Sequence, residues 1–419
     1  MTSLPGAALV LGLRRSGEPA ALALARRKVR VVGVDADGKL DAGRLRSAGV
    51  EVHLGAESDV ALVEGVQLLV KSPGVPSEAP LVVAARTRGI PVWSEVELGA
   101  RLVGQPEVGI TGTNGKTTTT ELVGAIYRSA GRPVAVAGNV GRSLCSLDGT
   151  LTGAEAIVCE LSSFQLEDID TFRCHIAVLL NLTPDHLDRH QTLEDYQAAK
   201  LRIFENQQPN DVAIVPHGFE RVPGSAARVE FAAGDSLPAE PILPGAHNRE
   251  NAAAAVAAVR AAGIDDAAIA AALRTFPGVP HRLETVRELD GVRYVNDSKA
   301  TNPDSAERAF EAYPAGTLRV ILGGSRKQAS FAALAQVARQ RRVLRAYLIG
   351  DTTPDLAAAL ADVGVSHVVC GDLESAVARA RADARPGEIV MLSPACASFD
   401  SFRSFEHRGD AFRELVEAL

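Results

Sequence analysis

Short apolar runs alternate with longer alanine- and arginine-rich stretches along this chain, and the alternation limits the folds that it can adopt. In the first ninety or so residues the apolar runs are ALVLGL, VRVVGVD and QLLVKSPG. A second series opens at EVGITGTNGKTTTTELVGAIYRSAG and continues with AIVCEL and IAVLLNLT. Strands that alternate with helices in this way predict βαβ units on parallel sheets.

The last 140 or so residues show the same organisation after a break. The segment TFPGVPHRLE, with two prolines and a glycine, ends the helical pattern of HNRENAAAAVAAVRAAG. Five apolar runs follow it: RYVNDS, LRVILGG, RAYLIG, SHVVC and EIVMLSP. Because 419 residues are too many for one core, we predict three α/β domains, with boundaries at residues 1–93, 94–279 and 280–419.

Charge and cysteine usage exclude several classes of protein. The 44 basic and 51 acidic residues give a net charge of −7, without the basic run that nucleic-acid binding needs. The five cysteines are scattered and never form a CxxC pair, so we expect neither disulfides nor a zinc knuckle, but a reducing cytoplasm. The run Ala7–Leu13 is too short for a signal peptide, and no run reaches the length of a membrane span.

The segment TGTNGKT, Thr111 to Thr117, carries the first chemical signal. Gly112 and Gly115 lie in a turn between a predicted strand and a long helix, where backbone N–H groups can point at phosphate oxygens. Lys116 would then contact the β- and γ-phosphates, and Thr117 a Mg²⁺ ion. The general GxxxxGK spacing would need glycine at 110, where Ile110 stands. An ordinary glycine turn with a solvated lysine is the alternative.

Three residues further along could act on a bound phosphate. Glu160 ends the strand IVCEL, His186 follows the strand IAVLLNLT, and Lys200 lies in the helical stretch DYQAAKLRIFEN. Ligands gather beyond the carboxyl ends of parallel strands, so Glu160 and His186 could bind a metal or orient the substrate. A helix-capping acid, a satisfied polar histidine and a solvated helix lysine are the alternatives for the three residues.

Taken together, these motifs resemble the Mur ligases. The matching segments run in the family's order over nearly the whole chain: TGTNGKT, GNVG (138–141), ELSSFQLE (160–167), LNLTPDHLDRH, AAKLRIFEN, HNRENAAAA, VPHRLE, NDSKATNPDS (296–305), LGG followed by Lys327, and LSPACASFDSFRSFEHRG (392–409). The resemblance implies a central P-loop-type ATPase domain with a mostly parallel sheet, between a Rossmann-like N-terminal UDP-sugar domain and a Rossmann-like C-terminal amino-acid domain. It also implies an ATP-dependent amide ligase that works through an acyl phosphate.

The same resemblance implies cofactors, substrates and site residues. ATP and Mg²⁺ would act on UDP-N-acetylmuramoyl-L-alanine and D-glutamate, in a protein that we expect to be monomeric. ATP would contact Gly112, Thr113, Asn114, Gly115, Lys116, Thr117, Thr118, Asn251, Arg282 and Asp297. Mg²⁺ would be held by Thr117, Glu160, His186 and a carbamylated Lys200, and the catalytic residues would be Lys116, His186 and Lys200. The UDP substrate would meet Ser72, Pro73, Gly74, Asn139 and His186, and D-glutamate would meet Lys299, Thr301, Lys327, Ser398 and Phe405.

Two departures from the family pattern lie near the N-terminus. The family's GLGxxG is GLRRSG here, Gly12 to Gly17, so Arg14 replaces the middle glycine. After the second strand, Ala36 and Asp37 stand where glutamate-adding members often carry a polar residue and an arginine. Two other functions stay open: a Mur-type or folylpolyglutamate-type ligase with another amino acid, and a nucleotide-binding scaffold without turnover.

Overall fold

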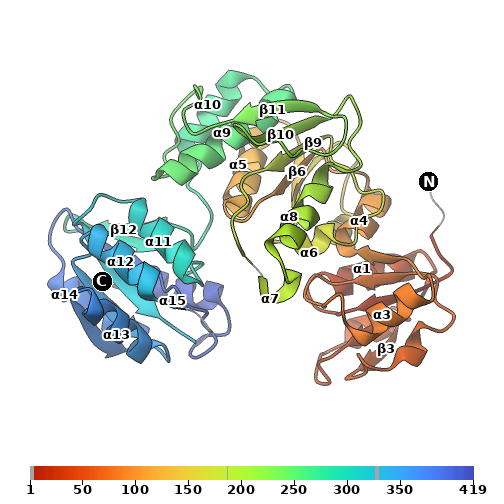
Figure 1. Ribbon diagram of the computed structural model, residues 1–419, viewed down its shortest axis with the longest axis horizontal. Helices are drawn as coiled ribbons and strands as arrows, with labels where there is room; N and C mark the ends of the chain where they lie inside the picture. Colours follow the sequence, from red (N-terminus) through yellow and green to blue (C-terminus); the bar gives the residue numbers. More distant parts are fainter. Residues whose placement is uncertain (1–3, 186, 326–329) are drawn as a thin grey trace. The chain divides into compact units, whose positions relative to one another are not determined.

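The computed structural model describes residues 4–185, 187–325 and 330–419 and contains three separate sheets (Figure 1). The chain divides into two compact units. The first unit holds the first two sheets, and the second holds the third sheet, from Pro277 onward together with the short segment Ile242–Ala246. The second unit therefore begins inside TFPGVPHRLE, whereas the boundary at residues 93 and 94 stays a prediction.

The first sheet has five parallel strands in the order β3-β2-β1-β4-β5. The predicted runs ALVLGL, VRVVGVD and QLLVKSPG form β1, β2 and β4. The strands are β1 Ala7–Leu11, β2 Arg30–Asp35, β3 Glu51–Leu54, β4 Leu69–Lys71 and β5 Val92–Ser94. The helices are α1 Gly17–Arg26, α2 Gly43–Ser47, η1 Val60–Val63, α3 Pro80–Thr87 and α4 Glu95–Val103.

The second sheet has six parallel strands in the order β11-β10-β9-β6-β8-β7. The strands are β6 Val108–Thr111, β7 Val134–Gly138, β8 Ala156–Glu160, β9 Ile176–Leu179, β10 Val212–Pro216 and β11 Ala227–Phe231. The helices are α5 Lys116–Ser129, η2 Leu144–Leu147, α6 Ser163–Leu166, α7 Leu187–His190, α8 Leu193–Leu201, η3 Arg202–Phe204, α9 Ala246–Ala261 and α10 Asp266–Thr275. Its strands are parallel, so their carboxyl ends share one edge.

The third sheet has the order β12-β13-β17-β14-β15-β16, and it is parallel except for the antiparallel pair β12 and β13. The five predicted runs form β13 to β17, while the edge strand β12 was not predicted. The strands are β12 Glu284–Leu289, β13 Val292–Asn296, β14 Leu318–Gly323, β15 Arg345–Ile349, β16 His367–Gly371 and β17 Ile389–Leu392. The helices are α11 Pro303–Glu311, α12 Ala332–Gln340, α13 Thr353–Asp362, α14 Leu373–Asp383 and α15 Phe405–Glu417.

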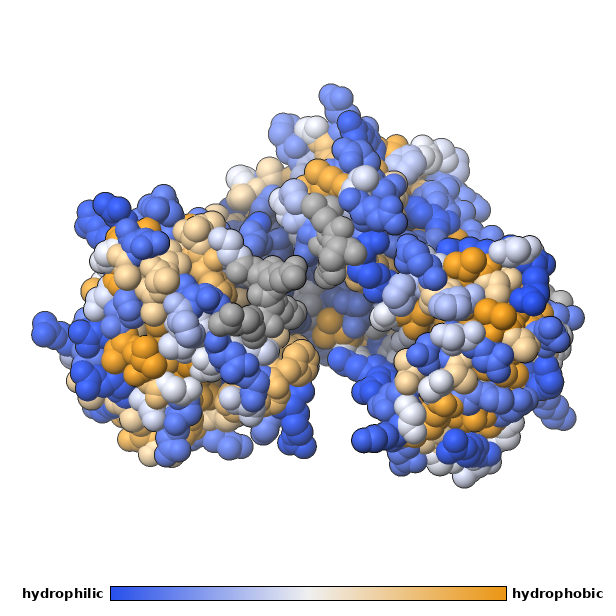
Figure 2. Space-filling model, turned by 60° about the horizontal axis from the view of Figure 1, so that its bottom comes forward, coloured by the Kyte–Doolittle hydropathy of each residue, from blue (hydrophilic) through white to orange (hydrophobic). Residues whose placement is uncertain are grey.

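Separate apolar layers hold the third sheet on its two faces. One layer joins the sheet to α11, α12 and α13, and the other joins it to α14 and α15 (Figure 1). The first sheet is covered in the same manner by α1 and α2 on one face and by α3 on the other. On the face of the molecule that Figure 2 displays, hydrophilic residues surround small hydrophobic groups. Within the described ranges, no helix is both long and apolar enough to cross a membrane.

A buried ion pair joins the first sheet to the second within the first compact unit. Lys71, at the end of β4, is fully buried, and its Nζ lies 2.7 Å from Oδ2 of Asp168, whose side chain is 4% exposed. The other carboxylate oxygen of Asp168 lies 2.7 Å from the guanidinium of Arg86, which is half exposed. Because both members of the Lys71–Asp168 pair are shielded from water, the charge of each is stabilised by the opposite charge of the other rather than by hydration.

We expect Lys71→Met to lower the free energy of unfolding by roughly 3–5 kcal/mol, because it leaves the Asp168 carboxylate buried beside a neutral side chain. Urea denaturation measures the change. Arg86→Met is the matched control: it removes a cation from the same carboxylate at an exposed position, where an ion pair contributes only about 0–1 kcal/mol. Equal losses in the two variants would show that burial of the pair has no special weight.

Candidate active site

The glycine turn between β6 and α5 has the geometry that TGTNGKT predicts. Lys116 is the first residue of α5, a helix of 14 residues, so the turn lies at its N-terminus. Gly115 has φ +86°, and a Cβ atom there would lie 2.2 Å from Oδ1 of Asn251 in α9. Only glycine fits this position without displacing a neighbour. Asn251, one of the predicted ATP contacts, is thereby placed directly against the turn.

Two lysines from distant parts of the chain meet at one carbonyl group of the turn. Lys116 Nζ donates hydrogen bonds to the carbonyl oxygens of Gly112, at 2.8 Å, and Thr113, at 2.9 Å. Lys200 Nζ, from the last turn of α8, donates to the same Gly112 oxygen at 2.8 Å. Lys200 is only 2% exposed, so the alternative of a solvated helix lysine is wrong.

Burial changes the chemistry of Lys200. Loss of hydration lowers the pKa of its amino group to about 6, with a smaller contribution from the charge of Lys116 in the same direction. Asp185 and Glu160 act in the opposite direction. An amine with this pKa is mostly uncharged at neutral pH, and an uncharged amine is a nucleophile. Lys200 can therefore react with CO₂, as the predicted carbamylation requires.

Glu160 is a buried carboxylate at the end of β8, and one of its two oxygens accepts no hydrogen bond from the described residues. Its Oε1 accepts a hydrogen bond of 3.0 Å from Nδ2 of Asn139, which follows β7. No donor among the described residues reaches Oε2. Because Glu160 is only 2% exposed, bulk water does not hydrate this oxygen either. A buried oxygen without a partner is costly unless a ligand completes it. A hard cation such as Mg²⁺ prefers such an oxygen.

The surroundings of Glu160 fit a metal that keeps substrate or water ligands. Thr117 and Thr118, in the first turn of α5, are both buried. Within the described residues, no group of three His, Cys, Asp or Glu side chains forms a complete cage. Mg²⁺ commonly uses one or two carboxylates and takes its other ligands from phosphates and water. His186, the remaining predicted ligand, lies outside the described residues.

The loop after β4 and the N-terminal departures lie at the carboxyl edge of the first sheet. Ser72 Oγ donates to the carbonyl oxygen of Gly12 at 2.7 Å, and the backbone oxygen of Pro73 accepts from Arg189 at 3.5 Å. Gly74 is exposed beside them. Arg14, at the position where the pattern has glycine, forms an ion pair of 2.6 Å with Asp37. The two departures therefore contact each other.

In the second unit, Asp297 is a buried carboxylate that follows β13. It accepts hydrogen bonds from Ser393 Oγ, at 2.7 Å, and from the backbone N–H of Leu283, at 3.2 Å. Burial raises the pKa of Asp297 to about 7, while Ser393 and the charge of Arg282 lower it. Arg282, the other predicted nucleotide contact from this unit, is partly buried.

The predicted amino-acid contacts gather where β13 and β17 end. Lys299 and Thr301 share the loop after β13, and the N–H of Thr301 donates to the Lys299 carbonyl at 2.8 Å. Ser398, in the loop after β17, is 1% exposed. The Lys299 ammonium lies 5.9 Å from the ring centre of Phe405, the first residue of α15. Lys327, the fifth predicted contact, is outside the described residues.

Two polar residues that support the turn were not predicted from the sequence. Tyr196, buried in α8, donates a hydrogen bond of 2.9 Å to Thr113 Oγ1. Asn181 Oδ1 accepts from the backbone N–H of Asn114 at 2.8 Å. Tyr196 stands four residues before Lys200 in one helix, so a shared helix face was the available signal.

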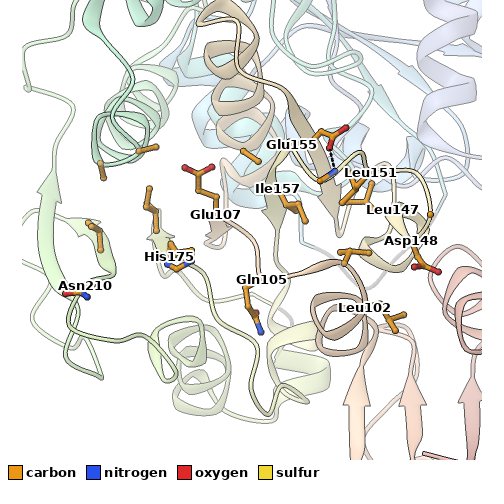
Figure 3. A pocket seen from close by; sticks show the side chains of 18 residues that line it. Leu102, Gln105, Glu107, Leu147, Asp148, Leu151, Glu155, Ile157, His175 and Asn210 are labelled. Atoms are coloured by element: carbon orange, nitrogen blue, oxygen red, sulfur yellow. Dashed lines mark hydrogen bonds between the residues drawn. The ribbon is translucent and has the colours of Figure 1, made fainter. Parts of the chain in front are cut away.

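A pocket of about 700 Å³ lies at the opposite edge of the second sheet (Figure 3). It is lined by residues at the starts of strands, among them Glu107 before β6, Ala156 in β8, His175 before β9 and Val212 in β10. The glycine turn follows the other end of β6. This pocket is therefore separate from the predicted nucleotide site.

Comparisons with known proteins identify the family to which the chain belongs. Residues 110–232 match the family model described as the Mur ligase middle domain, and residues 281–396 match the Mur ligase, glutamate ligase domain. The chain is 43% identical to the UDP-N-acetylmuramoylalanine--D-glutamate ligase of Pelotomaculum thermopropionicum, over 98% of this chain and 97% of that protein. The chain therefore belongs to the Mur ligase family.

Solved structures share the fold at low identity. The UDP-N-acetylmuramate-alanine ligase MurC from Thermotoga maritima is 18% identical, with a TM-score of 0.61 over 98% of this chain and 99% of that one. The MurF ligase from Thermotoga maritima in complex with ADP is 17% identical, with a TM-score of 0.61 over 93% and 95% of the two chains. The predicted α/β architecture is confirmed.

Proposed function

We propose that this protein is an ATP-dependent ligase that joins D-glutamate to UDP-N-acetylmuramoyl-L-alanine during the synthesis of peptidoglycan precursors. One observation carries the proposal: two lysine amines converge on the Gly112 carbonyl, and Glu160 adds a buried carboxylate oxygen without a donor. This is an arrangement for anionic phosphate and a hard cation. The name and full-length similarity of the Pelotomaculum relative support the choice of reaction and substrates.

The reaction proceeds in two steps. The carboxylate of the UDP substrate attacks the γ-phosphorus of ATP, the bond to ADP breaks, and an acyl phosphate forms. The amine of D-glutamate then attacks the acyl carbon and loses a proton, and phosphate leaves. Lys116 offsets the negative charge on the phosphate oxygens during the first step, and the backbone N–H groups of the turn orient them.

Glu160, Thr117, His186 and carbamylated Lys200 are the proposed ligands of Mg²⁺, which when bound supplies positive charge beside the phosphates. Carbamylation joins the Lys200 nitrogen to CO₂ with loss of one proton. The product is an anionic oxygen donor in place of an amine, and hard cations prefer oxygen. Asn139 holds Glu160 in place and, with Ser72, Pro73 and Gly74, contacts the UDP substrate. Asn251, Arg282 and Asp297 contact the nucleotide.

We place the reaction in the cytoplasm and expect the protein to act as a monomer. The five cysteines, all within the described residues, form no disulfide, which suits a reducing compartment.

Phosphate release from ATP tests the function. The protein is assayed with ATP, Mg²⁺ and UDP-N-acetylmuramoyl-L-alanine, in the presence and absence of D-glutamate. Sustained release should need both substrates, and the product should gain the mass of one glutamyl residue. Equal release without the UDP substrate would contradict the proposed ligase reaction, and nucleotide binding with no release would indicate a scaffold.

The choice of amine should depend on the side-chain carboxylate. D-glutamate brings two carboxylates, which Lys299, Thr301, Ser398 and Lys327 are proposed to meet. An analogue without the second carboxylate leaves buried donors unpaired, so D-glutamate should exceed D-glutamine and D-alanine in kcat/KM by roughly 10²-fold or more. L-Glutamate should also fail, because inversion at the α-carbon swings the amine away when both carboxylates are held.

Competition between amines in one reaction, read by product mass, measures this preference. Equal incorporation of L-alanine, L-lysine or diaminopimelate would keep the ligase assignment and refute the choice of D-glutamate.

A further inference from the structure

Arg408, in the first half of α15, is a buried cation that the proposed reaction does not use. It is 1% exposed, and within the described part of the chain no carboxylate lies at ion-pair distance from it; the charge of Asp400 acts on it from further away. Burial lowers the pKa of its guanidinium to about 10, so the group remains charged at neutral pH. A buried charge must be compensated by hydrogen bonds. The partners of Arg408 therefore indicate why the charge is there.

Four oxygen atoms accept hydrogen bonds from this guanidinium. Nε donates to Ser298 Oγ at 3.0 Å, and Nη2 donates to the backbone oxygen of Ser298 at 2.9 Å. Nη2 also reaches the backbone oxygen of Cys396 at 3.1 Å, and Nη1 reaches that of Ala397 at 3.2 Å. All four acceptors lie in two loops. Arg408 is thus a bridge between loops and not a member of an ion-pair network.

The two loops leave neighbouring strands at the same edge of the third sheet. Ser298 follows β13, and Cys396 and Ala397 follow β17, which pairs with β13 in parallel. Ser298 Oγ also donates to the backbone oxygen of Phe405 at 2.8 Å, which attaches the start of α15 to the same group. The planar guanidinium, with its five N–H donors, fixes the spacing of the loops in a way that one ammonium group cannot.

The loop after β17 has a backbone that needs such support. Ala395 has φ +60°, a conformation that costs energy for any residue with a Cβ atom. A Cβ atom on Gly324, the residue after β14, would lie 2.1 Å from the backbone oxygen of Ala397. The loop is therefore pressed against the sheet, and it persists because surrounding contacts, including those of Arg408, determine its position.

Three of the four proposed amino-acid contacts among the described residues adjoin an acceptor of Arg408, and the fourth, Thr301, donates to the Lys299 carbonyl. Lys299 follows Ser298 in sequence, Ser398 follows Ala397, and Phe405 is tied to Ser298. We infer that Arg408 is a positioning residue that sets the separation of Lys299 and Ser398 and thereby the affinity for an amino acid with two carboxylates. This inference rests on the proposed function, because that function assigns the amine substrate to these loops.

Arg408→Met and Arg408→Lys test the inference by steady-state kinetics. Arg408→Met should raise the KM for D-glutamate roughly tenfold or more, since loosened carboxylate contacts are charge-assisted hydrogen bonds. The KM for ATP should stay within about twofold of wild type. Arg408→Lys keeps the positive charge but loses the planar guanidinium with its several N–H donors. Its KM for D-glutamate should therefore lie between those of the wild type and Arg408→Met. A residue that only supports the fold would not separate the two KM values in this way.

Arg319→Met is the matched control. Arg319 is mostly buried and belongs to β14, but it contacts Glu388 and Tyr347 near the opposite edge of the third sheet. Its replacement should lower the melting temperature without a selective change in the KM for D-glutamate. If Arg319→Met and Arg408→Met raise that KM equally, the positioning role is refuted.

Hydrogen exchange of the free protein separates this inference from the proposed function. In Arg408→Met, or in Arg408→Lys if the first variant does not fold, residues 298–301 and 396–399 should exchange faster, while β14 and β15 retain wild-type exchange. Absence of D-glutamate ligation by the wild type, with this exchange pattern present, contradicts the proposed substrate but supports the bridge between loops. Wild-type exchange in both loops, in a variant that folds, overturns the inference.

Discussion

Lys116→Ala is expected to lower turnover by roughly 10²-fold or more, because it removes the cation that we propose offsets the negative charge on the phosphate oxygens during phosphoryl transfer. In the structure, Lys116 Nζ bonds to two carbonyl oxygens of the turn, Gly112 and Thr113. These bonds hold the ammonium at the turn before a nucleotide arrives. Phosphate release with both substrates measures the effect.

The control for this variant removes a lysine far from the turn. Lys28, exposed between α1 and β2, has φ +63°, so Lys28→Asn removes the charge and keeps a residue that tolerates this backbone. It should retain wild-type turnover, and Lys116→Ala should retain the wild-type melting temperature. Turnover of Lys116→Ala within about tenfold of wild type would contradict the phosphate-loop assignment.

The parts of the site that the sequence predicted are those that local patterns define. The glycine turn is a contiguous motif, and Glu160 ends a recognisable apolar run, so both could be placed at one sheet edge. The role of Lys200 could not be predicted from a local pattern. From residue pattern alone it looked like a surface lysine, and only the resemblance to the Mur ligases gave it a role; the structure adds that it is buried against Gly112.

The contacts that were not predicted join segments far apart in sequence. Tyr196 reaches Thr113 across 83 positions, and Arg408 reaches Ser298 across 110. No local periodicity specifies such partners, since they depend on how sheets and loops pack. The antiparallel strand β12 was missed for another reason. It is an edge strand with mixed burial, so its sequence ETVREL lacks the continuous apolar run that marks a buried parallel strand.

The two N-terminal departures from the family pattern, Arg14 and Asp37, are explained by their contact with each other. Arg14 and Asp37 each look unfavourable beside the family pattern, yet their side chains form an ion pair. The pair is largely exposed and adds little stability. Its consequence is electrostatic: Arg14 offsets the negative charge that Asp37 brings to this edge of the sheet, where we propose that the UDP substrate binds.

Lys200→Ala is expected to be nearly inactive, because it removes the proposed anionic metal ligand from a buried position. Short-chain carboxylic acids should partly restore its turnover by supplying the missing oxygen atoms. Lys116→Ala is the matched control, since the same acids cannot replace a cation and should not restore it. Intact-mass measurement of the wild type under native, CO₂-exposed conditions should show the added carbamate.

Lowering the pH should reduce the carbamylation of Lys200. Burial lowers the pKa of its amino group from 10.5 to about 6, and only the uncharged amine reacts with CO₂. Carbamate formation should therefore persist above pH 6 and decline as the pH falls through that value. In the wild type, turnover and carbamate mass should fall together, whereas acid-rescued Lys200→Ala should lack this step in its pH profile. An unmodified lysine mass, together with full activity of Lys200→Ala, would show that the amine has no part in the reaction.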